Sequence, residues 1–171
     1  GSLLHANIAS CAVIAAISGS SVATEATIGT VAIPELEKRG YESKIVLGSL
    51  AAGGTLGILI PPSICMIIYG AMAEESVGQL FIAGVFPGIA LCYTMVDFLA
   101  LRVMTKPGIA PAFEGMPWSQ RGSSILRMWP VVIIMFMVLG GIYLGVVTPT
   151  EAAALGSFAA LVIALAFRRL N

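Results

Sequence analysis

The stretch Gly53-Gly54-Thr55-Leu56-Gly57-Ile58-Leu59-Ile60-Pro61-Pro62-Ser63 lies inside a longer run, residues 45–73, that carries no charged side chain. That run is long enough to cross a bilayer, which takes about 20 apolar residues. The two prolines have no N–H group, and their rings collide with carbonyls of the preceding turn. Three glycines just upstream weaken the helix further, by about 1 kcal/mol each relative to alanine. The stretch therefore predicts a helix that breaks inside the membrane.

We expect the two halves of this broken helix near residues 45–54 and 61–73. Lipid offers no hydrogen bonds, so the carbonyls freed at the break must face protein, water or an ion. Secondary transporters build ion and substrate sites from helices broken at this depth. The pattern thus predicts part of a transporter.

Composition places the whole chain in a membrane. Hydrophobic residues make up 58% of it and charged residues only 11%, with a mean hydropathy of +0.97. Soluble domains carry about 25% charged residues. The net charge is zero and the sequence has no Lys/Arg stripe, so we expect no nucleic acid among its partners. An all-α membrane protein in contact with the lipid bilayer is predicted.

The sequence gives no support for an enzyme or a cofactor. Its one histidine, His5, would need to reach Ser20 or Ser21 to form a hydrolase dyad. A straight helix would separate these residues by about 22 Å. The three cysteines show neither disulfide nor metal spacing. The chain also starts without Met in an apolar segment, which predicts an excised piece of a longer protein.

Upstream of the broken helix, residues 3–33 form two short apolar limbs. Limb 3–17 ends in the small polar run Ser18-Gly19-Ser20-Ser21, and limb 22–33 ends at Pro34. Neither limb spans a bilayer alone. This pattern favours a re-entrant helical hairpin with its tip at residues 18–21. The alternative is one continuous, kinked spanning helix over 3–33.

Charge and hydropathy divide the remaining sequence. The expected segments are a charged loop at 35–44, an acidic turn at 74–76, a span at 77–101 containing Pro87, a polar connection at 102–127, a span at 128–147 and an apolar helix at 149–167. The basic residues of 102–127 place that connection in the cytoplasm by the positive-inside rule. Counting spans then puts 35–44 and Arg168-Arg169 on the same side. Trp118 and Trp129 suit an interfacial belt.

The candidate site is the hairpin tip facing the helix break. Serine hydroxyls and unpaired carbonyls are hard oxygen donors suited to an alkali cation, and the first half-helix points its negative end at the break. The second half-helix presents its positive end, which suits an anion. We therefore expect sodium beside an anionic substrate. The candidate residues are Ser18, Gly19, Ser20, Ser21, Gly53, Gly54, Thr55, Gly57, Pro61, Pro62 and Ser63. The alternative is that glycine and proline serve only close packing and kinking.

Two other acidic positions need an explanation. Glu25 lies just past the tip, and an ionisable group inside a membrane segment is a functional candidate. Alternatively, the short limb leaves Glu25 near water or a partner chain, without a role. Thr148-Pro149-Thr150-Glu151 is the pattern of a capping box with proline in the first helical position, so we expect a helix start there.

These motifs together resemble the large membrane subunit of tripartite ATP-independent periplasmic (TRAP) transporters, of the dicarboxylate type. The matching stretches are Ser18-Gly-Ser-Ser-Val-Ala-Thr24, Ala51-Ala-Gly-Gly-Thr-Leu-Gly-Ile-Leu-Ile-Pro-Pro-Ser63, Leu80-Phe-Ile-Ala-Gly-Val-Phe-Pro-Gly88 and Thr148-Pro-Thr-Glu-Ala-Ala-Ala154. They cover nearly the whole chain in order. Glu25 departs from the family pattern, which leads us to expect a small residue there.

The resemblance implies a central fragment of an elevator-type carrier in the ion-transporter superfamily. Residues 1–73 would be part of the transport domain, with the hairpin at 3–33 and the broken helix at 45–73. Residues 74–127 would hold a transmembrane helix and the cytoplasmic connection between repeats, and 128–171 would begin the second inverted repeat. Sodium would bind at Ser18–Ser21 and at the Gly53–Pro62 break.

The resemblance also implies a function and partners. The expected function is sodium-coupled transport of a C4-dicarboxylate, sialic acid or similar carboxylate across a bacterial or archaeal inner membrane. The expected partners are a small membrane subunit and a periplasmic substrate-binding protein. Two alternatives remain: an ion channel or carrier of another ion-transporter family, and a purely structural membrane module.

Overall fold

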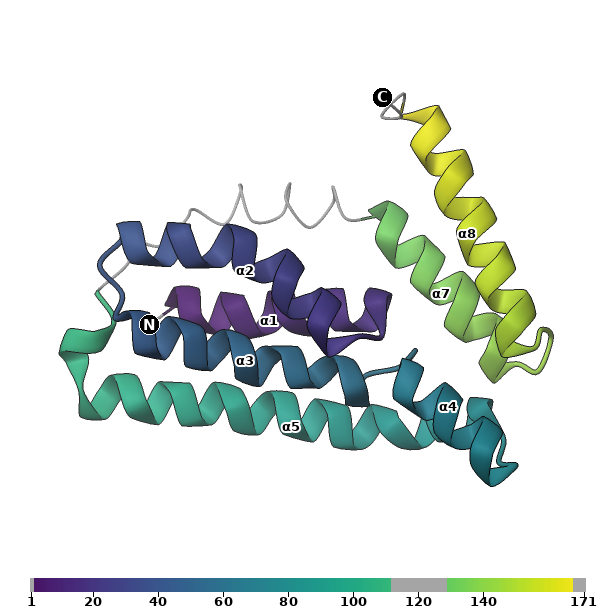
Figure 1. Ribbon diagram of the computed structural model, residues 1–171, viewed down its shortest axis with the longest axis horizontal. Coiled ribbons are helices and arrows are strands. Elements are labelled where there is room, and N and C mark those ends of the chain that lie inside the picture. Colours follow the sequence, from purple (N-terminus) through teal and green to yellow (C-terminus); the bar gives the residue numbers. More distant parts are fainter. Residues whose placement is uncertain (1, 112–128, 168–171) are drawn as a thin grey trace. The chain divides into compact units, whose positions relative to one another are not determined.

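The computed structural model describes residues 2–111 and 129–167, and in these residues the chain is helical, with turns and no strand (Figure 1). The helices are α1 (Ser2–Ser18), α2 (Ser21–Lys38), α3 (Ser43–Leu59), α4 (Ile64–Ala73), α5 (Val77–Thr105), the 3-10 turn η1 (Pro107–Ile109), α7 (Trp129–Tyr143) and α8 (Pro149–Ala166). The all-α prediction is confirmed.

Three segments are long and apolar enough to cross a membrane. They are Ser43–Ala73, which contains α3 and α4, then Val77–Thr105 and Pro149–Ala166. Leu3–Ser18 and Trp129–Tyr143 are apolar but shorter. The described residues divide into two compact units: α1 to α4 with α5 from Leu80 onward and η1, and α7 with α8 and Val77–Gln79. The chain is thus a multi-pass membrane protein.

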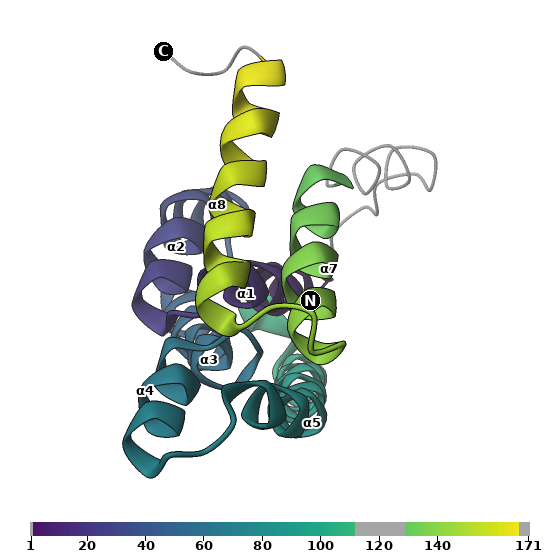
Figure 2. The same cartoon turned by 90° about the vertical axis from the view of Figure 1, so that its right-hand side faces the viewer.

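In the first unit, α1 and α2 form a helical hairpin that packs on α3. Figure 2 shows α1, α3 and α5 nearly end-on; α3 packs on α1, and α5 runs alongside α3 in both Figure 1 and Figure 2. Buried side chains of α1, such as Leu4 and Ile8, join Val46 and Leu56 of α3 in one apolar cluster, which Leu99 of α5 completes. The predicted helical hairpin is therefore confirmed, and the alternative of one continuous helix over 3–33 is wrong.

The end of α2 differs from the prediction, because the helix passes Pro34 and stops at Lys38. The stop is a Schellman motif at Gly40, which has φ +77. The Gly40 N–H donates to the Glu37 carbonyl at 2.9 Å, and the Tyr41 N–H donates to the Leu36 carbonyl at 3.1 Å. Tyr41 and Leu36 are both buried, in line with the apolar contact that often accompanies this motif. The expected loop at 35–44 is consequently shorter, because its first four residues are helical.

The break in the third element also lies later than predicted. Helix α3 runs through Gly53, Gly54 and Gly57 to Leu59, and α4 begins at Ile64. The three glycines are buried against the hairpin, so tertiary packing offsets their weak helix propensity. Only the prolines interrupt the helix. The peptide bond between Pro61 and Pro62 is cis.

The remaining boundaries follow the same chemistry. Helix α5 continues past the predicted residue 101 to Thr105. Helix α7 stops at Tyr143 rather than 147, at a second Schellman motif in which Gly145 has φ +68. Helix α8 begins with the predicted capping box: Thr148 accepts from the Glu151 N–H, and the Glu151 carboxylate accepts from the Thr148 N–H. The connection at 102–127 is described only to residue 111, and Trp118 and Arg168-Arg169 lie outside the described residues.

In the second unit, α7 and α8 pack as an antiparallel pair. A Cβ on Gly156 of α8 would lie 2.9 Å from Cγ2 of Val138 on α7, so the two backbones approach closely there. At the other end of the pair, the rings of Trp129 and Phe167 lie 6.1 Å apart between centroids. Trp129 is half exposed, and its position at a membrane interface stays a prediction.

Candidate functional site: the hairpin tip and the helix break

The tip of the α1–α2 hairpin lies directly on the break between α3 and α4. Gly19 occupies the tip with φ +60, and a Cβ built on it would overlap the carbonyl oxygen of Pro62. The Gly19 carbonyl accepts a hydrogen bond from the Ile64 N–H at 3.1 Å. That N–H belongs to the first turn of α4, where the helix itself supplies no acceptor. The backbone of the hairpin tip thus supplies a hydrogen-bond acceptor that the first turn of α4 lacks.

A second close approach lies one turn earlier, at Gly57. A Cβ there would lie 2.7 Å from the carbonyl carbon of Ser20 and 2.8 Å from the amide nitrogen of Ser21. Both distances are too short for any side chain. Glycine at this position therefore lets the start of α2 rest on the last turn of α3, with no side chain between the backbones.

Inside the break, a side chain replaces a missing backbone donor. In a continuous helix, the N–H of residue 62 would donate to the carbonyl of Ile58, but Pro62 has none. The Ser63 hydroxyl donates to that carbonyl instead, at 2.6 Å, and Ser63 is fully buried. One orphan carbonyl of the break is satisfied in this way. The Ile60 N–H keeps its helical bond to Leu56, at 2.8 Å.

The tip also carries a compact cluster of oxygens. The Ser20 carbonyl accepts from the Thr24 N–H at 3.0 Å and from the Thr24 hydroxyl at 2.8 Å. The hydroxyls of Thr24 and Ser18 lie 3.0 Å apart, and the Ser18 hydroxyl also donates to the Ser20 carbonyl at 3.3 Å. The Ser20 hydroxyl caps α2 by accepting from the Ala23 N–H at 3.4 Å. Much of the oxygen at the tip is therefore held in fixed positions.

The two limbs of the hairpin contact α3 at its paired glycines. A Cβ on Gly53 would lie 2.7 Å from Sγ of Cys11 on α1. A Cβ on Gly54 would overlap the Glu25 side chain, including a carboxylate oxygen. Glu25 is partly buried, and its carboxylate lies one helical turn along α3 from the contact between Gly57 and the tip. Glu25 is thus the acidic side chain of the hairpin that packs nearest to the break.

The structure brings most of the sequence-predicted residues together, but not all of them. Close backbone contacts and hydrogen bonds join a set of residues at the tip and the break, namely Gly19, Ser20, Ser21, Gly57, Pro62 and Ser63, and a further hydrogen bond links Ser18 to Ser20 within the tip. Pro61 is buried in the break. Thr55 is exposed, and its hydroxyl donates to the Ala52 carbonyl of its own helix instead of bonding to the tip. Gly53 and Gly54 contact the hairpin limbs instead of the tip.

Sequence reasoning left two participants out of the predicted site. Thr24 is fully buried, and its hydroxyl organises the tip. Its position four residues after Ser20 is the spacing at which a threonine hydroxyl bonds back to a helix carbonyl, so the spacing was a usable signal. Ile58 contributes only its carbonyl, and no feature of an isoleucine side chain predicts that role.

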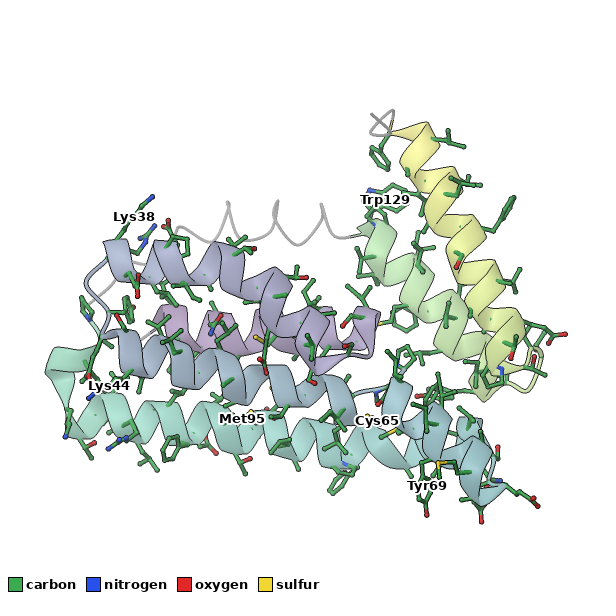
Figure 3. All side chains as sticks on the ribbon, viewed as in Figure 1. Lys38, Lys44, Cys65, Tyr69, Met95 and Trp129 are labelled. Carbon is green, nitrogen blue, oxygen red and sulfur yellow. The ribbon has the colours of Figure 1, made fainter. Side chains whose placement is uncertain are left out.

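The arrangement is suited to binding a hard cation next to an anion. Carbonyl and hydroxyl oxygens converge where the C-terminal end of α3, with its partial negative charge, meets the hairpin tip. The N-terminal end of α4 starts at the same place and carries the opposite partial charge. In Figure 3, Cys65, which lies in the first turn of α4 just after the break, is far from Lys38 and Lys44 at the end of the same unit.

Comparison with known proteins identifies the family. Residues 1–171 match the family model described as tripartite ATP-independent periplasmic transporter, DctM component. The C4-dicarboxylate TRAP transporter large permease protein DctM of Pseudomonas aeruginosa is 42% identical over 167 residues, which cover 96% of this chain and 38% of that protein. The ectoine TRAP transporter large permease protein TeaC of Halomonas elongata is 36% identical over 155 residues, covering 90% and 36%.

A third relative, the sialic acid TRAP transporter permease protein SiaT of Haemophilus influenzae, is 32% identical over 163 residues, covering 95% of this chain and 26% of that protein. The chain spans less than two-fifths of the length of each of these three relatives. The relatives are named for chemically different substrates, so the similarity fixes the family and leaves the substrate open. The chain therefore belongs to the family of DctM components of tripartite ATP-independent periplasmic transporters, as its motifs predict.

Proposed function

We propose that this chain is the central part of the large permease subunit of a sodium-coupled TRAP transporter that imports an organic anion. Residues 1–73 would supply one half of the sodium and substrate site within a moving transport domain. A small membrane subunit and a periplasmic substrate-binding protein would complete the system in the cytoplasmic membrane. Each net positive charge that enters with sodium across a potential of 100 mV would contribute about 2.3 kcal/mol of free energy to transport.

One observation carries this proposal: the hairpin tip is seated on the helix break. The Gly19 carbonyl bonds to the first N–H of α4, and the Ser20 backbone rests on Gly57. Backbone oxygens and hydroxyls are therefore concentrated where two half-helix ends meet. A sodium ion takes ligands of this kind, and a carboxylate substrate would be favoured at the N-terminal end of α4.

Glu25 would add a negative charge to this site. Its carboxylate packs against Gly54, one turn of α3 from the tip contact. A carboxylate at that position would attract a coupling cation without being displaced by the substrate. We therefore include Glu25 in the proposed cation-binding region as an electrostatic contributor rather than a direct ligand.

The substrate would be a carboxylate such as a C4-dicarboxylate or sialic acid. Relatives are named for C4-dicarboxylate, sialic acid and ectoine, which carry a carboxylate group, and for isethionate, which carries a sulfonate group, so an acidic anionic group is common to all four. The shared feature is the group that the N-terminal end of α4 would attract. Selectivity among these substrates would depend on parts of the transporter outside this chain.

The test is uptake into proteoliposomes that contain the complete transporter. We expect accumulation of a radiolabelled carboxylate only when an inward sodium gradient and the loaded binding protein are both present. Uptake that does not depend on the sodium gradient or on the binding protein would instead favour a channel or a carrier of another family. Matched potassium gradients control for the membrane potential.

A second experiment separates a transport role from a purely structural one. Replacing both prolines of the break, Pro61→Ala with Pro62→Ala, restores the backbone donors of a continuous helix. We expect the double variant to insert in the membrane but to lose sodium-dependent uptake, because the half-helix ends would no longer meet the tip. Full activity in this variant would support the structural-module alternative.

A further inference from the structure

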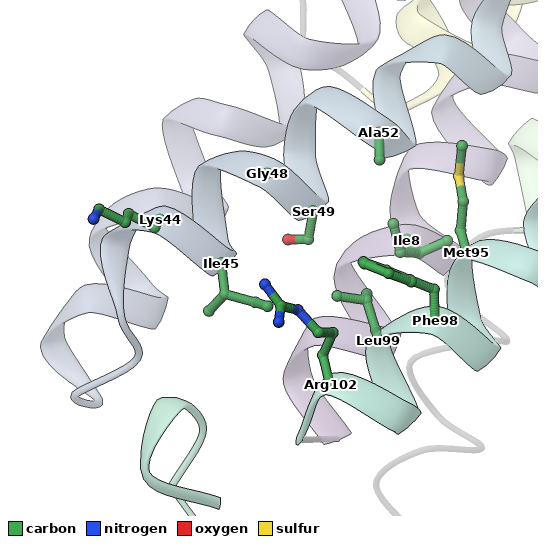
Figure 4. A pocket seen from close by; sticks show the side chains of 10 residues that line it. All are labelled: Ile8, Lys44, Ile45, Gly48, Ser49, Ala52, Met95, Phe98, Leu99 and Arg102. Carbon is green, nitrogen blue, oxygen red and sulfur yellow. The ribbon is translucent and has the colours of Figure 1, made fainter. Parts of the chain in front are cut away.

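We propose that the groove between α3 and α5 binds an anionic phospholipid, with the headgroup at its charged end and an acyl chain along its apolar floor. This inference does not depend on sodium coupling. The groove has a volume of about 220 Å³ and is lined by α3 and α5, with Ile8 of α1 at its base. It is shown in Figure 4.

Two basic side chains lie at the same end of the groove. Lys44 is in the first turn of α3, and Arg102 is in the last turn of α5. The guanidinium of Arg102 lies over the Phe98 ring, 6.0 Å from its centroid, and extends toward α3 beside Ile45 (Figure 4). No carboxylate is among the described residues that line the groove. This end therefore has the charge that a phosphate diester requires.

The rest of the groove becomes apolar with distance from these charges. Met95 of α5 lies seven residues before Arg102, and Ala52 of α3 lies eight residues after Lys44. On a helix these separations correspond to roughly 10 and 12 Å. Because α3 and α5 run antiparallel here, both helices change from basic to apolar in the same direction. A charged head followed by a hydrocarbon chain is the matching shape.

The placement of the groove in the membrane favours a lipid over a soluble ligand. Both walls belong to segments long and apolar enough to span a bilayer, and the basic residues lie at the ends of those segments. The groove thus begins at the membrane face and continues toward the hydrocarbon. Anionic lipids accumulate near basic clusters at the cytoplasmic face, which is the side that the positive-inside rule assigns to this end.

The direct test is lipid binding by the complete, detergent-purified permease, measured by native mass spectrometry. Phosphatidylglycerol and phosphatidylcholine with identical acyl chains serve as probes. Two basic contacts at a membrane surface predict a preference for phosphatidylglycerol on the order of 30-fold. Glycerol 3-phosphate, which has the anionic group without the chain, should not displace the bound lipid. Equal binding of both lipids, or displacement by glycerol 3-phosphate, would overturn the proposal.

Charge variants identify the headgroup end. We expect Lys44→Gln with Arg102→Gln to abolish the preference for phosphatidylglycerol. Lys38→Gln with Lys106→Gln removes the same charge from exposed positions outside the groove and should leave the preference unchanged. An unchanged preference in the first pair, or an equal loss in the control pair, would show that the groove does not bind the headgroup.

A steric variant tests the apolar floor without altering charge or weakening the helix. Gly48 lines the groove, and a Cβ on it meets nothing within 4 Å, so the side chain of Gly48→Leu would start in open space and occupy part of the groove. We expect this variant to lose bound phosphatidylglycerol, while Ala51→Leu, on an exposed position of α3 outside the groove, retains it. Retention in Gly48→Leu would contradict the proposal. A photo-crosslinking group at position 95, which lines the groove, gives a second test. Crosslinks to protein instead of lipid would also contradict the proposal, because they would place another helix in the groove.

Discussion

Gly19 and Pro62 are in backbone contact, so close that a Cβ on Gly19 would overlap the Pro62 carbonyl oxygen. The two residues are far apart in sequence and belong to the hairpin tip and to the helix break. Their contact holds the oxygens of both elements in one place.

Gly19→Ala should abolish sodium-dependent uptake. The substitution adds about 1–2 kcal/mol of backbone strain at φ +60, and its methyl group must also push the tip away from the break. Gly145→Ala is the matched control, because Gly145 has φ +68 but open space around its Cβ position. Uptake and thermal unfolding of the complete transporter are the measurements. An equal effect of both substitutions would mean that strain alone, and not the contact with Pro62, is responsible.

Ser63→Ala should destabilise the folded transporter by about 1–3 kcal/mol, because the Ile58 carbonyl would lose its donor in a buried position. Ser157→Ala is the control, since the Ser157 hydroxyl bonds to its own helix on an exposed surface. The measurement is the denaturant midpoint in detergent or lipid nanodiscs. Equal midpoints for the two variants would contradict the role of the Ser63 hydroxyl.

Gly54→Leu and Ser20→Leu should each abolish sodium-dependent uptake without preventing membrane insertion. A leucine at 54 would displace the Glu25 side chain, and a leucine at 20 would remove the cap of α2 and disturb the tip. Insertion is checked by surface labelling and by membrane fractionation. Ala51→Leu, on the exposed side of α3, should transport normally. Wild-type uptake at saturating sodium in the first two variants would remove the proposed site.

Glu25→Gln should raise the sodium concentration needed for half-maximal uptake by roughly 20-fold. The estimate follows from a unit charge about 10 Å from the cation at an effective dielectric constant near 20, which contributes about 1.7 kcal/mol. The volume of the side chain is kept, so its packing against Gly54 is preserved. Glu37→Gln, at an exposed position of α2, should leave the sodium dependence unchanged. An unaltered sodium dependence in Glu25→Gln would assign that carboxylate a packing role only.

The sequence predicted the elements that contain a strong local signal. Two adjacent prolines interrupt a helix wherever they occur inside it, and the predicted interruption lies at residues 60–63. The capping box at Thr148 could also be predicted from the sequence, because all the groups that form it lie within four consecutive residues. The small polar run at 18–21 indicated a reversal of the chain, and the turn is centred on Gly19 and Ser20.

The errors came from positions where tertiary contacts decide. Gly53, Gly54 and Gly57 lower helix propensity in isolation, but the hairpin packs against all three and keeps them helical. Pro34 suggested a stop because proline removes a donor, yet the apolar pairing of Leu36 with Tyr41 around Gly40 sets the end one turn later. The contact of Glu25 with Gly54 joins residues of two helices, so no local pattern encodes it.

The bond between the Ile64 N–H and the Gly19 carbonyl limits how the hairpin can move. Sliding the hairpin alone would leave an amide hydrogen of α4 without an acceptor, in surroundings where water is scarce. We therefore expect the hairpin and both half-helices to move together as one piece. In the proposed transporter, a path for substrate would then open along the outer border of that piece, and not between its own members.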